Sequence, residues 1–203
     1  MEANNYERQS NLINPFAYWV ITGSVAAGEY PGSQFSHSIA TNSATLIHST
    51  RALLRSKNPF MNSTSHKINS LLDAGIRTFI DLTEVDERPD YRSRLHKERR
   101  ERSVNVKYHR FPIKDKQVPT VDQMKDILEL VKSEIAIGGK VYIHCFRGLG
   151  RTGLTVGCLI KEYGLTSGDP IQDIKLMRRG LAGDFRTSPE TEAQIQFVVD
   201  WAG

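Results

Sequence analysis

Apolar residues along this chain recur with two spacings that alternate from one end to the other. Short runs rich in β-branched and aromatic residues predict buried strands, and apolar residues three and four apart predict helices that bury one face. Strands are predicted within 16–21, 25–32, 76–82, 104–111 and 141–144. Because helical segments separate the last three, we expect an α/β fold with a central, mainly parallel sheet flanked by helices on both faces.

Capping residues and glycines set the expected helix boundaries. The predicted helices lie within 65–74, 91–102, 120–137, 151–163, 169–179 and 188–201. Thr120 to Gln123 has the sequence of a capping box, and segment 151–163 is apolar nearly all round, which predicts a helix buried inside the domain. The last helix is expected to begin at Ser188. Its expected inward side chains are Ile195, Val198, Val199 and Trp201.

Polar and mixed stretches divide the chain into three parts. Residues 1–14 are polar and predict a flexible N-terminal tail. Residues 15–203 then form a single domain, which is large enough to bury a core without a disulfide or a structural metal. Within it, segment 33–62 mixes Ser, Thr, Asn and His with a few helical spacings, and we interpret it as an insertion.

Composition and charge narrow the classes of protein only a little. The net charge of +4 favours anionic partners without identifying one. No apolar run is long enough to span a bilayer, and the first 14 residues lack a basic start and apolar centre, so we expect a soluble, cytoplasmic protein. The histidines at 37, 48 and 66 have no ligand spacing, so no metal is expected.

Segment 91–102 is strongly basic but carries two interspersed glutamates. A helix of this composition could touch nucleic acid or anionic lipid. Mixed charge is more typical of a solvated helix face, and no aromatic residues interleave to stack on bases. We therefore expect no nucleic-acid partner.

The chemistry of the chain is concentrated in residues 141–153, V-Y-I-H-C-F-R-G-L-G-R-T-G. This pattern predicts a strand, a tight loop and a helix, with Cys145 at the end of the strand. Backbone N–H groups and a helix N-terminus that converge there would stabilise a thiolate and bind a dianion. Gly148 and Gly150 are expected to supply positive φ angles, and Arg151 can hold two phosphoryl oxygens with its planar fork.

Seven positions of this segment match C-x-x-G-x-G-R-[ST]-G preceded by His: His144, Cys145, Gly148, Gly150, Arg151, Thr152 and Gly153. The match resembles the signature loop of the protein tyrosine phosphatase superfamily. Two alternatives are a strand–turn–helix element with a structural cysteine, and a rhodanese-like sulfurtransferase, which usually lacks the G-x-G-R-T-G continuation. The other cysteine, Cys158, is interpreted as a core residue rather than as a redox partner of Cys145.

Two further segments are similar to the dual-specificity branch of that superfamily. Asp115 lies in F-P-I-K-D, 30 residues before Cys145, which resembles the loop that carries the branch's general acid. The alternative for Asp115 is a residue of an ordinary turn. Segment 27–32, A-G-E-Y-P-G, resembles the entry segment of small microbial members.

The resemblance implies residue roles and no cofactor or metal. Cys145 would be the nucleophile, Arg151 would hold the phosphate, Asp115 would be the general acid, and Thr152 and His144 would assist the thiolate and order the loop. The implied substrate-binding residues are Phe146, Arg147, Gly148, Leu149, Gly150, Arg151 and Gln194. Gln194 belongs to a stretch that resembles the glutamine loop of tyrosine phosphatases, which this chain departs from at Glu190. Glu84 or Glu87 could orient Arg151, although solvated loop acids are the alternative.

The implied reaction is the hydrolysis of phosphotyrosine in proteins through a phosphocysteine intermediate. Phosphoserine and phosphothreonine are implied as further substrates. The basic helix keeps phosphoinositides and other non-protein phosphate monoesters as alternative substrates. An adaptor that binds phosphate without turnover is the alternative from another class. A deep, aromatic-walled cleft would select phosphotyrosine, whereas a shallower cleft would admit phosphoserine and phosphothreonine.

Overall fold

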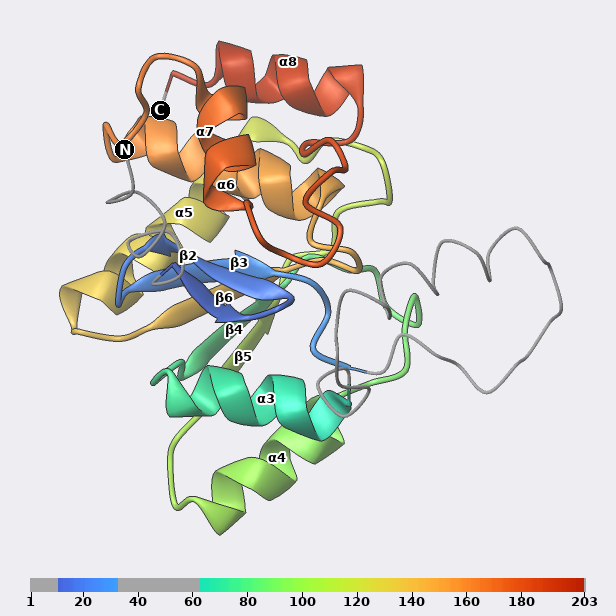
Figure 1. Cartoon of the computed structure of the whole chain (residues 1–203), viewed down its shortest axis with the longest axis vertical. Coiled ribbons are helices and arrows are strands. Elements are labelled where there is room, and N and C mark those ends of the chain that lie inside the picture. Colours follow the sequence, from blue (N-terminus) through green and yellow to red (C-terminus); the bar gives the residue numbers. More distant parts are fainter. Residues whose placement is uncertain (1–10, 33–62, 203) are drawn as a thin grey trace, which may run out of the picture.

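In a computed structural model, which describes residues 11–32 and 63–202, a six-stranded sheet forms the centre of the molecule (Figure 1). Its strands are β1 (Leu12–Asn14), β2 (Ala17–Ile21), β3 (Val25–Gly28), β4 (Thr78–Asp81), β5 (Lys107–Arg110) and β6 (Val141–His144), in the order β1-β2-β3-β6-β4-β5. The pairs β3–β6, β6–β4 and β4–β5 are parallel, and the N-terminal pairs are antiparallel. The mainly parallel sheet is confirmed.

Helices cover both faces of this sheet (Figure 1). They are α3 (Thr64–Asp73), α4 (Arg92–Glu101), α5 (Val121–Ala136), α6 (Gly150–Glu162), α7 (Pro170–Met177) and α8 (Glu192–Asp200). The helices α3 and α4 lie on one face, and α5 to α8 lie on the other. Each face has its own apolar core. The α/β fold with two covered faces is therefore as expected.

The central strand β6 is buried on both faces because its side chains alternate between the two cores. Val141 and Ile143 pack with α5 and α6, whereas Tyr142 packs with α3. His144, the last residue of β6, is level with Gly28 of β3 and Asp81 of β4. The carboxyl ends of three strands therefore meet at one edge, where open α/β sheets bind ligands.

Helix starts agree with the sequence in part. Asp169 caps α7 by accepting hydrogen bonds from the N–H groups of Ile171 and Gln172, at 3.0 Å each. Thr120 likewise accepts from the N–H of Gln123 at 3.1 Å. The side chain of Gln123, however, donates to the Pro112 carbonyl at 3.0 Å, so the predicted capping box is only half formed.

The predicted tail was wrong at its C-terminal end. Leu12–Asn14 forms β1 and pairs with β2, while Asn14 Nδ2 donates to Ser70 Oγ at 2.6 Å. Residues 1–10 of the predicted tail lie outside the described residues, and so does the predicted insertion at 33–62. Nor does either histidine at 37 or 48 lie within them.

The start of the last helix was also wrong. Helix α8 begins at Glu192, and Thr191 and Gln194 form a reciprocal capping box. Of the expected inward residues, Val198 and Trp201 are buried and Ile195 is half-buried, but Val199 is 51 % exposed. The shift moves Gln194 to the buried first turn of the helix.

The basic segment forms α4 as a mixed-charge surface helix. Leu95 and Glu98 turn inward, and Arg94 pairs with Glu98 at 2.6 Å. Most of the remaining cationic side chains are exposed, as expected for a solvated face. None of the helices in residues 11–32 and 63–202 is long and apolar enough to cross a bilayer.

Candidate active site

The loop between β6 and α6 carries Cys145 at its base. Cys145 is buried, and Gly148 adopts φ +66° where a Cβ would lie 2.4 Å from the carbonyl carbon of Gly28. Only glycine fits that close approach. Gly150 is different, because it starts α6 without a positive φ. A Cβ there would meet the Glu190 carboxylate and the Gln194 amide at 2.8 and 2.9 Å, so the expected positive φ is correct for Gly148 and wrong for Gly150.

Carbonyl groups fix this loop and leave its N–H groups available. The Phe146 carbonyl accepts from Tyr30 N–H at 3.0 Å, and the Leu149 carbonyl accepts from Ser188 Oγ at 2.8 Å. Within the described part of the chain, the N–H groups of residues 146–152 donate no hydrogen bond to the protein. Because α6 begins at the end of this loop without a side-chain cap, the segment provides donors for an anion.

Arg151 is buried, and Glu87 fixes its guanidinium. Nη1 and Nη2 donate to the two carboxylate oxygens of Glu87 at 2.7 Å each, and Nη1 also donates to the Ile113 carbonyl at 3.0 Å. Burial alone would lower the pKa of Arg151, but the Glu87 hydrogen bonds and the nearby charges of Cys145 and Asp115 raise it above its ordinary value. Arg151 is therefore a permanent cation beside Cys145.

Glu87 is itself held as a carboxylate. Burial would raise the pKa of the Glu87 carboxyl, but hydrogen bonds from Arg151 and from the Glu84 N–H outweigh this effect and lower it. Of the two acids considered from the sequence, Glu84 is exposed and Glu87 holds the arginine. The solvated alternative is therefore wrong for Glu87.

Asp115 meets the same guanidinium from the opposite loop. Its Oδ1 lies 3.2 Å from Arg151 Nη2, although the side chain is 60 % exposed. Asp115 lies in the loop that begins after β5, and the buried side chain of Ile113 anchors this loop to the core. The structure thus brings the Cys145 loop and Asp115 together, as the sequence predicts.

Helix α8 tethers the loop that carries Asp115. Gln194 Nε2 donates to the Gln117 carbonyl at 3.1 Å, and Thr191 Oγ1 donates to the Lys116 carbonyl at 3.4 Å. Gln194 Oε1 accepts from the N–H groups of Glu190 and Thr191. The buried Gln194 amide is thus hydrogen-bonded at both ends to protein, beside Gly150.

His144 is a buried neutral imidazole with both nitrogens paired. Its Nδ1 lies 3.2 Å from the Cys145 carbonyl, and its Nε2 lies 2.8 Å from the Tyr91 hydroxyl. A carbonyl can only accept, so the geometry assigns the proton to Nδ1 and makes Tyr91 the donor to Nε2. Burial lowers the pKa of His144 despite the carboxylate of Asp81, 3.9 Å away.

Asp81 completes a buried network behind the loop. Its Oδ1 accepts from the N–H and hydroxyl of Thr83 at 2.9 and 2.6 Å, and its Oδ2 accepts from Tyr108 and Arg110 at 2.6 and 3.0 Å. Sequence reasoning missed Asp81 and Tyr91. A signal existed for Asp81, because an acid at the carboxyl end of a buried strand points to the ligand-binding edge.

The remaining predicted residues differ in exposure. Thr152 is buried, and its Oγ1 has no hydrogen-bond partner among the residues that the structure describes. Leu149 is buried, Phe146 is half-buried and Arg147 is exposed. Cys158 lies in the core of α6, as interpreted, and burial raises the pKa of its thiol.

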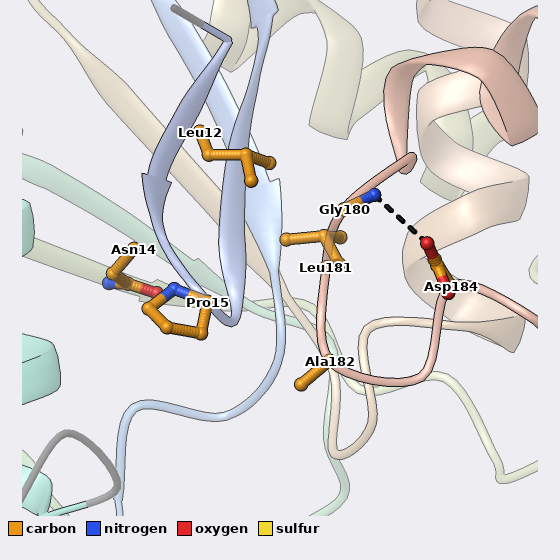
Figure 2. Close-up of a pocket in the computed structure, with 7 residues that line it drawn as sticks. All are labelled: Leu12, Asn14, Pro15, Gly180, Leu181, Ala182 and Asp184. Atoms are coloured by element: carbon orange, nitrogen blue, oxygen red, sulfur yellow. Dashed lines mark hydrogen bonds between the residues drawn. The ribbon is translucent and has the colours of Figure 1, made fainter. Parts of the chain in front are cut away.

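A surface pocket of about 460 Å³ lies elsewhere on the molecule, between β1 and the segment that follows α7 (Figure 2). It is lined by Leu12, Asn14, Pro15, Gly180, Leu181, Ala182 and Asp184. None of the Cys145 loop contributes to it, so the candidate site rests on its chemistry and not on cavity volume. Over the described ranges, no group of three His, Cys, Asp or Glu side chains is placed to hold a metal.

Residues 56–164, more than half of the chain, match the family described as "Polymorphic toxin system, DSP-PTPase phosphatase". The chain belongs to this family. The matched segment contains both Asp115 and the Cys145 loop, and the family lies in the cysteine-based protein tyrosine phosphatase superfamily, in its dual-specificity-like part. The resemblance seen in the sequence is confirmed.

Relatives of known sequence agree with this membership, and a solved structure has the same fold. A Dictyostelium discoideum protein described as a probable protein tyrosine phosphatase type IVA B is 38 % identical over 100 residues, 47 % of this chain and 56 % of its own length. Tyrosine-protein phosphatase CDC14 of Saccharomyces cerevisiae is 29 % identical over 90 residues, 44 % of this chain and 16 % of its own. The active form of Tk-PTP shares the fold, with a TM-score of 0.56 and 21 % identity over 92 % of this chain and 96 % of that one.

Proposed function

We propose that this chain is a cysteine-dependent phosphatase that hydrolyses phosphotyrosine in proteins, with phosphoserine and phosphothreonine as further substrates. The observation that carries the proposal is the position of Arg151. Its buried guanidinium lies beside Cys145, is held by Glu87 and contacts Asp115 at 3.2 Å. A phosphate-binding cation, a nucleophile and an acid thus share one small site.

In the first step, the thiolate of Cys145 attacks phosphorus in line with the leaving oxygen. An S–P bond forms as the P–O bond to the substrate breaks. Arg151 and the N–H groups of residues 146–152 hold the three equatorial oxygens. The protonated carboxyl of Asp115 gives its proton to the leaving oxygen, which departs as the hydroxyl of tyrosine. Bound phosphate competes for Arg151, which frees Asp115 to turn toward that oxygen.

In the second step, water attacks the phosphocysteine. Asp115, now ionised, takes a proton from that water, the S–P bond breaks, and phosphate and the Cys145 thiolate are released. The buried Thr152 hydroxyl, which has no hydrogen-bond partner in residues 11–32 and 63–202, stabilises the departing thiolate. His144 orders the loop through the Cys145 carbonyl. Neither step requires a metal or an organic cofactor.

Phosphate release from p-nitrophenyl phosphate and from a phosphotyrosine peptide tests the proposal between pH 5 and 8. We expect native protein to turn over both substrates and Cys145→Ser to turn over neither. Asp115→Asn should lose about 10²- to 10³-fold on the peptide and less on p-nitrophenyl phosphate, whose leaving group needs little protonation. Equal losses on both substrates would remove Asp115 from the role of acid.

Other substrate classes are outcomes of the same assay. Faster release from soluble phosphoinositides than from any phosphopeptide would make the chain a phosphatase of non-protein phosphate monoesters. Tight phosphopeptide binding without turnover by reduced native protein would make it an adaptor. The proposed acid and nucleophile favour the catalytic reading over the adaptor.

The family description also connects such domains with polymorphic toxin systems. We propose that the phosphatase activity itself is the toxic activity and that it acts in the cytoplasm, where Cys145 stays reduced. Growth of cells that express native protein or Cys145→Ser in the cytoplasm tests this. Growth arrest by native protein alone supports it, and equal growth contradicts it.

A further inference from the structure

Two arginine side chains lie near one aromatic ring beside the candidate nucleophile. The guanidinium carbon of Arg88 lies 3.4 Å from the centroid of the Phe146 ring, and that of Arg147 lies 5.7 Å from the same centroid. Phe146 directly follows Cys145, and Arg88 directly follows Glu87, the partner of Arg151. The arginine pair therefore flanks the phosphate-binding guanidinium from two loops.

In the part of the chain that the structure describes, the charge of Arg88 acts on the Glu87 carboxylate without a close ion pair. No carboxylate there forms an ion pair with Arg88 or Arg147, and Arg88 Nε is buried without any hydrogen bond. The two guanidinium carbons are no further apart than their combined distances to the ring, so the charges repel within about a Debye length. An anion that contacts both guanidinium groups would relieve this repulsion.

We propose that Arg88 and Arg147 form a second anion subsite, which binds a carboxylate or phosphate on the residue next to the phosphoresidue of a peptide. This rests on the proposed function, since it assumes that the phosphoresidue occupies the Cys145 loop. Stacking on Phe146 orients the Arg88 plane, so its two terminal nitrogens can make a bidentate contact. The two guanidinium groups together would bind one further anionic group of the peptide, besides the phosphate in the Cys145 loop.

The subsite is tested by binding, apart from turnover. Two phosphotyrosine peptides, identical except for Asp or Asn next to the phosphotyrosine, are titrated into the Cys145→Ser protein. We expect the Asp peptide to bind about tenfold more tightly at low salt, and this ratio to shrink as salt is added. When Arg88→Gln or Arg147→Gln is introduced into the Cys145→Ser protein, the ratio of the two peptide affinities should fall to about twofold or less. Because each ratio is taken within one variant, a general loss of affinity cancels.

Arg100→Gln in the Cys145→Ser protein is the matched control, because Arg100 is an exposed arginine of α4 with no side-chain partner among the described residues. It removes the same charge and should keep the tenfold ratio. A ratio near one in the parent protein, or a ratio that survives both Arg88→Gln and Arg147→Gln, overturns the subsite. The affinity of a soluble inositol bisphosphate is measured in the same variants. If Arg88→Gln and Arg147→Gln lower that affinity more than they lower the affinity for the Asp peptide, the assignment to peptides is overturned.

The outcomes separate this subsite from the proposed function. If native protein releases no phosphate, the phosphatase proposal fails, yet a tenfold binding ratio that depends on Arg88 still establishes the subsite. If turnover is normal and the ratio is one, only the subsite fails.

Discussion

The carboxylate of Glu87 holds the guanidinium of Arg151 through two hydrogen bonds of 2.7 Å each. Glu87 comes from the loop after β4, and Arg151 from the first turn of α6. This pair therefore joins two neighbouring loops at the carboxyl edge of the sheet. Since the guanidinium is buried, the phosphate binding proposed for Arg151 would depend on an acid that does not itself touch phosphate.

Glu87→Gln should lower kcat for phosphate release about 10- to 100-fold. The amide keeps one acceptor but loses the charge and the fork-to-fork geometry, so Arg151 can leave the orientation that transition-state binding needs. The free energy of unfolding should fall by about 1–3 kcal/mol, because a buried cation loses its partner. Steady-state kinetics and urea unfolding of the same sample measure both effects.

The control is Glu84→Gln, which changes an exposed acid three residues away in the same loop. It should leave kcat and stability near native values. If Glu87→Gln keeps native kcat while its stability falls, Glu87 supports the fold and does not position Arg151 for catalysis.

Gln194 holds the loop of the candidate acid, and its replacement should act through Asp115. In Gln194→Ala the hydrogen bond to the Gln117 carbonyl is lost, so Asp115 is less often placed over the leaving oxygen. We expect kcat for a phosphotyrosine peptide to fall about tenfold, with a smaller effect on p-nitrophenyl phosphate. Gln196→Ala, an exposed glutamine of α8, serves as control.

A uniform loss on both substrates would contradict this role for Gln194. It would indicate instead that the amide acts on the phosphate or on the attacking water, as the resemblance to the glutamine loop implies. The comparison therefore separates a residue that positions the acid loop from one that takes part in hydrolysis.

Local sequence signals predicted the elements whose determinants are close together in the chain. The strand, loop and helix around Cys145 follow from the alternation in β6, the left-handed position of Gly148 and the apolar residues of α6. Asp115, which lies 3.2 Å from Arg151, could be proposed from the sequence because the pattern of its loop is contiguous. Even the start of α8 has a local signal, since Thr191-x-x-Gln194 forms a capping box, but Ser188-Pro189 upstream carries a competing start signal.

Contacts between distant segments could not be predicted in the same way. Glu84 and Glu87 both lie in the loop after β4, and only the course of that loop, with φ +63° at Asp86, turns Glu87 toward Arg151. Similarly, β1 has only three residues. Its pairing with β2 supplies the stability that its own sequence does not signal.

Gly148 should tolerate no side chain. A comparison with Gly164 separates the effect of close packing from the effect of a positive φ angle. Both have similar φ angles, +66° and +61°, but a Cβ at Gly148 would lie 2.4 Å from the backbone of Gly28, whereas nothing lies within 4 Å at Gly164. Gly164→Ala should cost about 1–2 kcal/mol of unfolding free energy through backbone strain alone. Gly148→Ala should cost more and should reduce turnover about 100-fold, because the loop must move. Equal behaviour of the two variants would contradict the close packing of the loop.

Acid should weaken the network behind the loop through Asp81. Burial would raise the pKa of Asp81, but the charge of His144 when protonated and the hydrogen bonds from Thr83 and Tyr108 lower it below the ordinary 3.8. The unfolded chain therefore binds the proton more readily, so this stabilisation is present above about pH 3.8 and is lost as pH falls through the lower folded value. Thermal unfolding between pH 2 and 7 should show Asp81→Asn less stable than native protein at pH 7.

The gap in melting temperature between native protein and Asp81→Asn should then narrow below pH 4, as native protein loses its ionised Asp81 and the variant has none to lose. Asp122→Asn, an exposed acid in the first turn of α5, should follow native protein throughout. Such a gap that stays constant down to pH 2 would mean that Asp81 stabilises the fold through shape and hydrogen bonds alone.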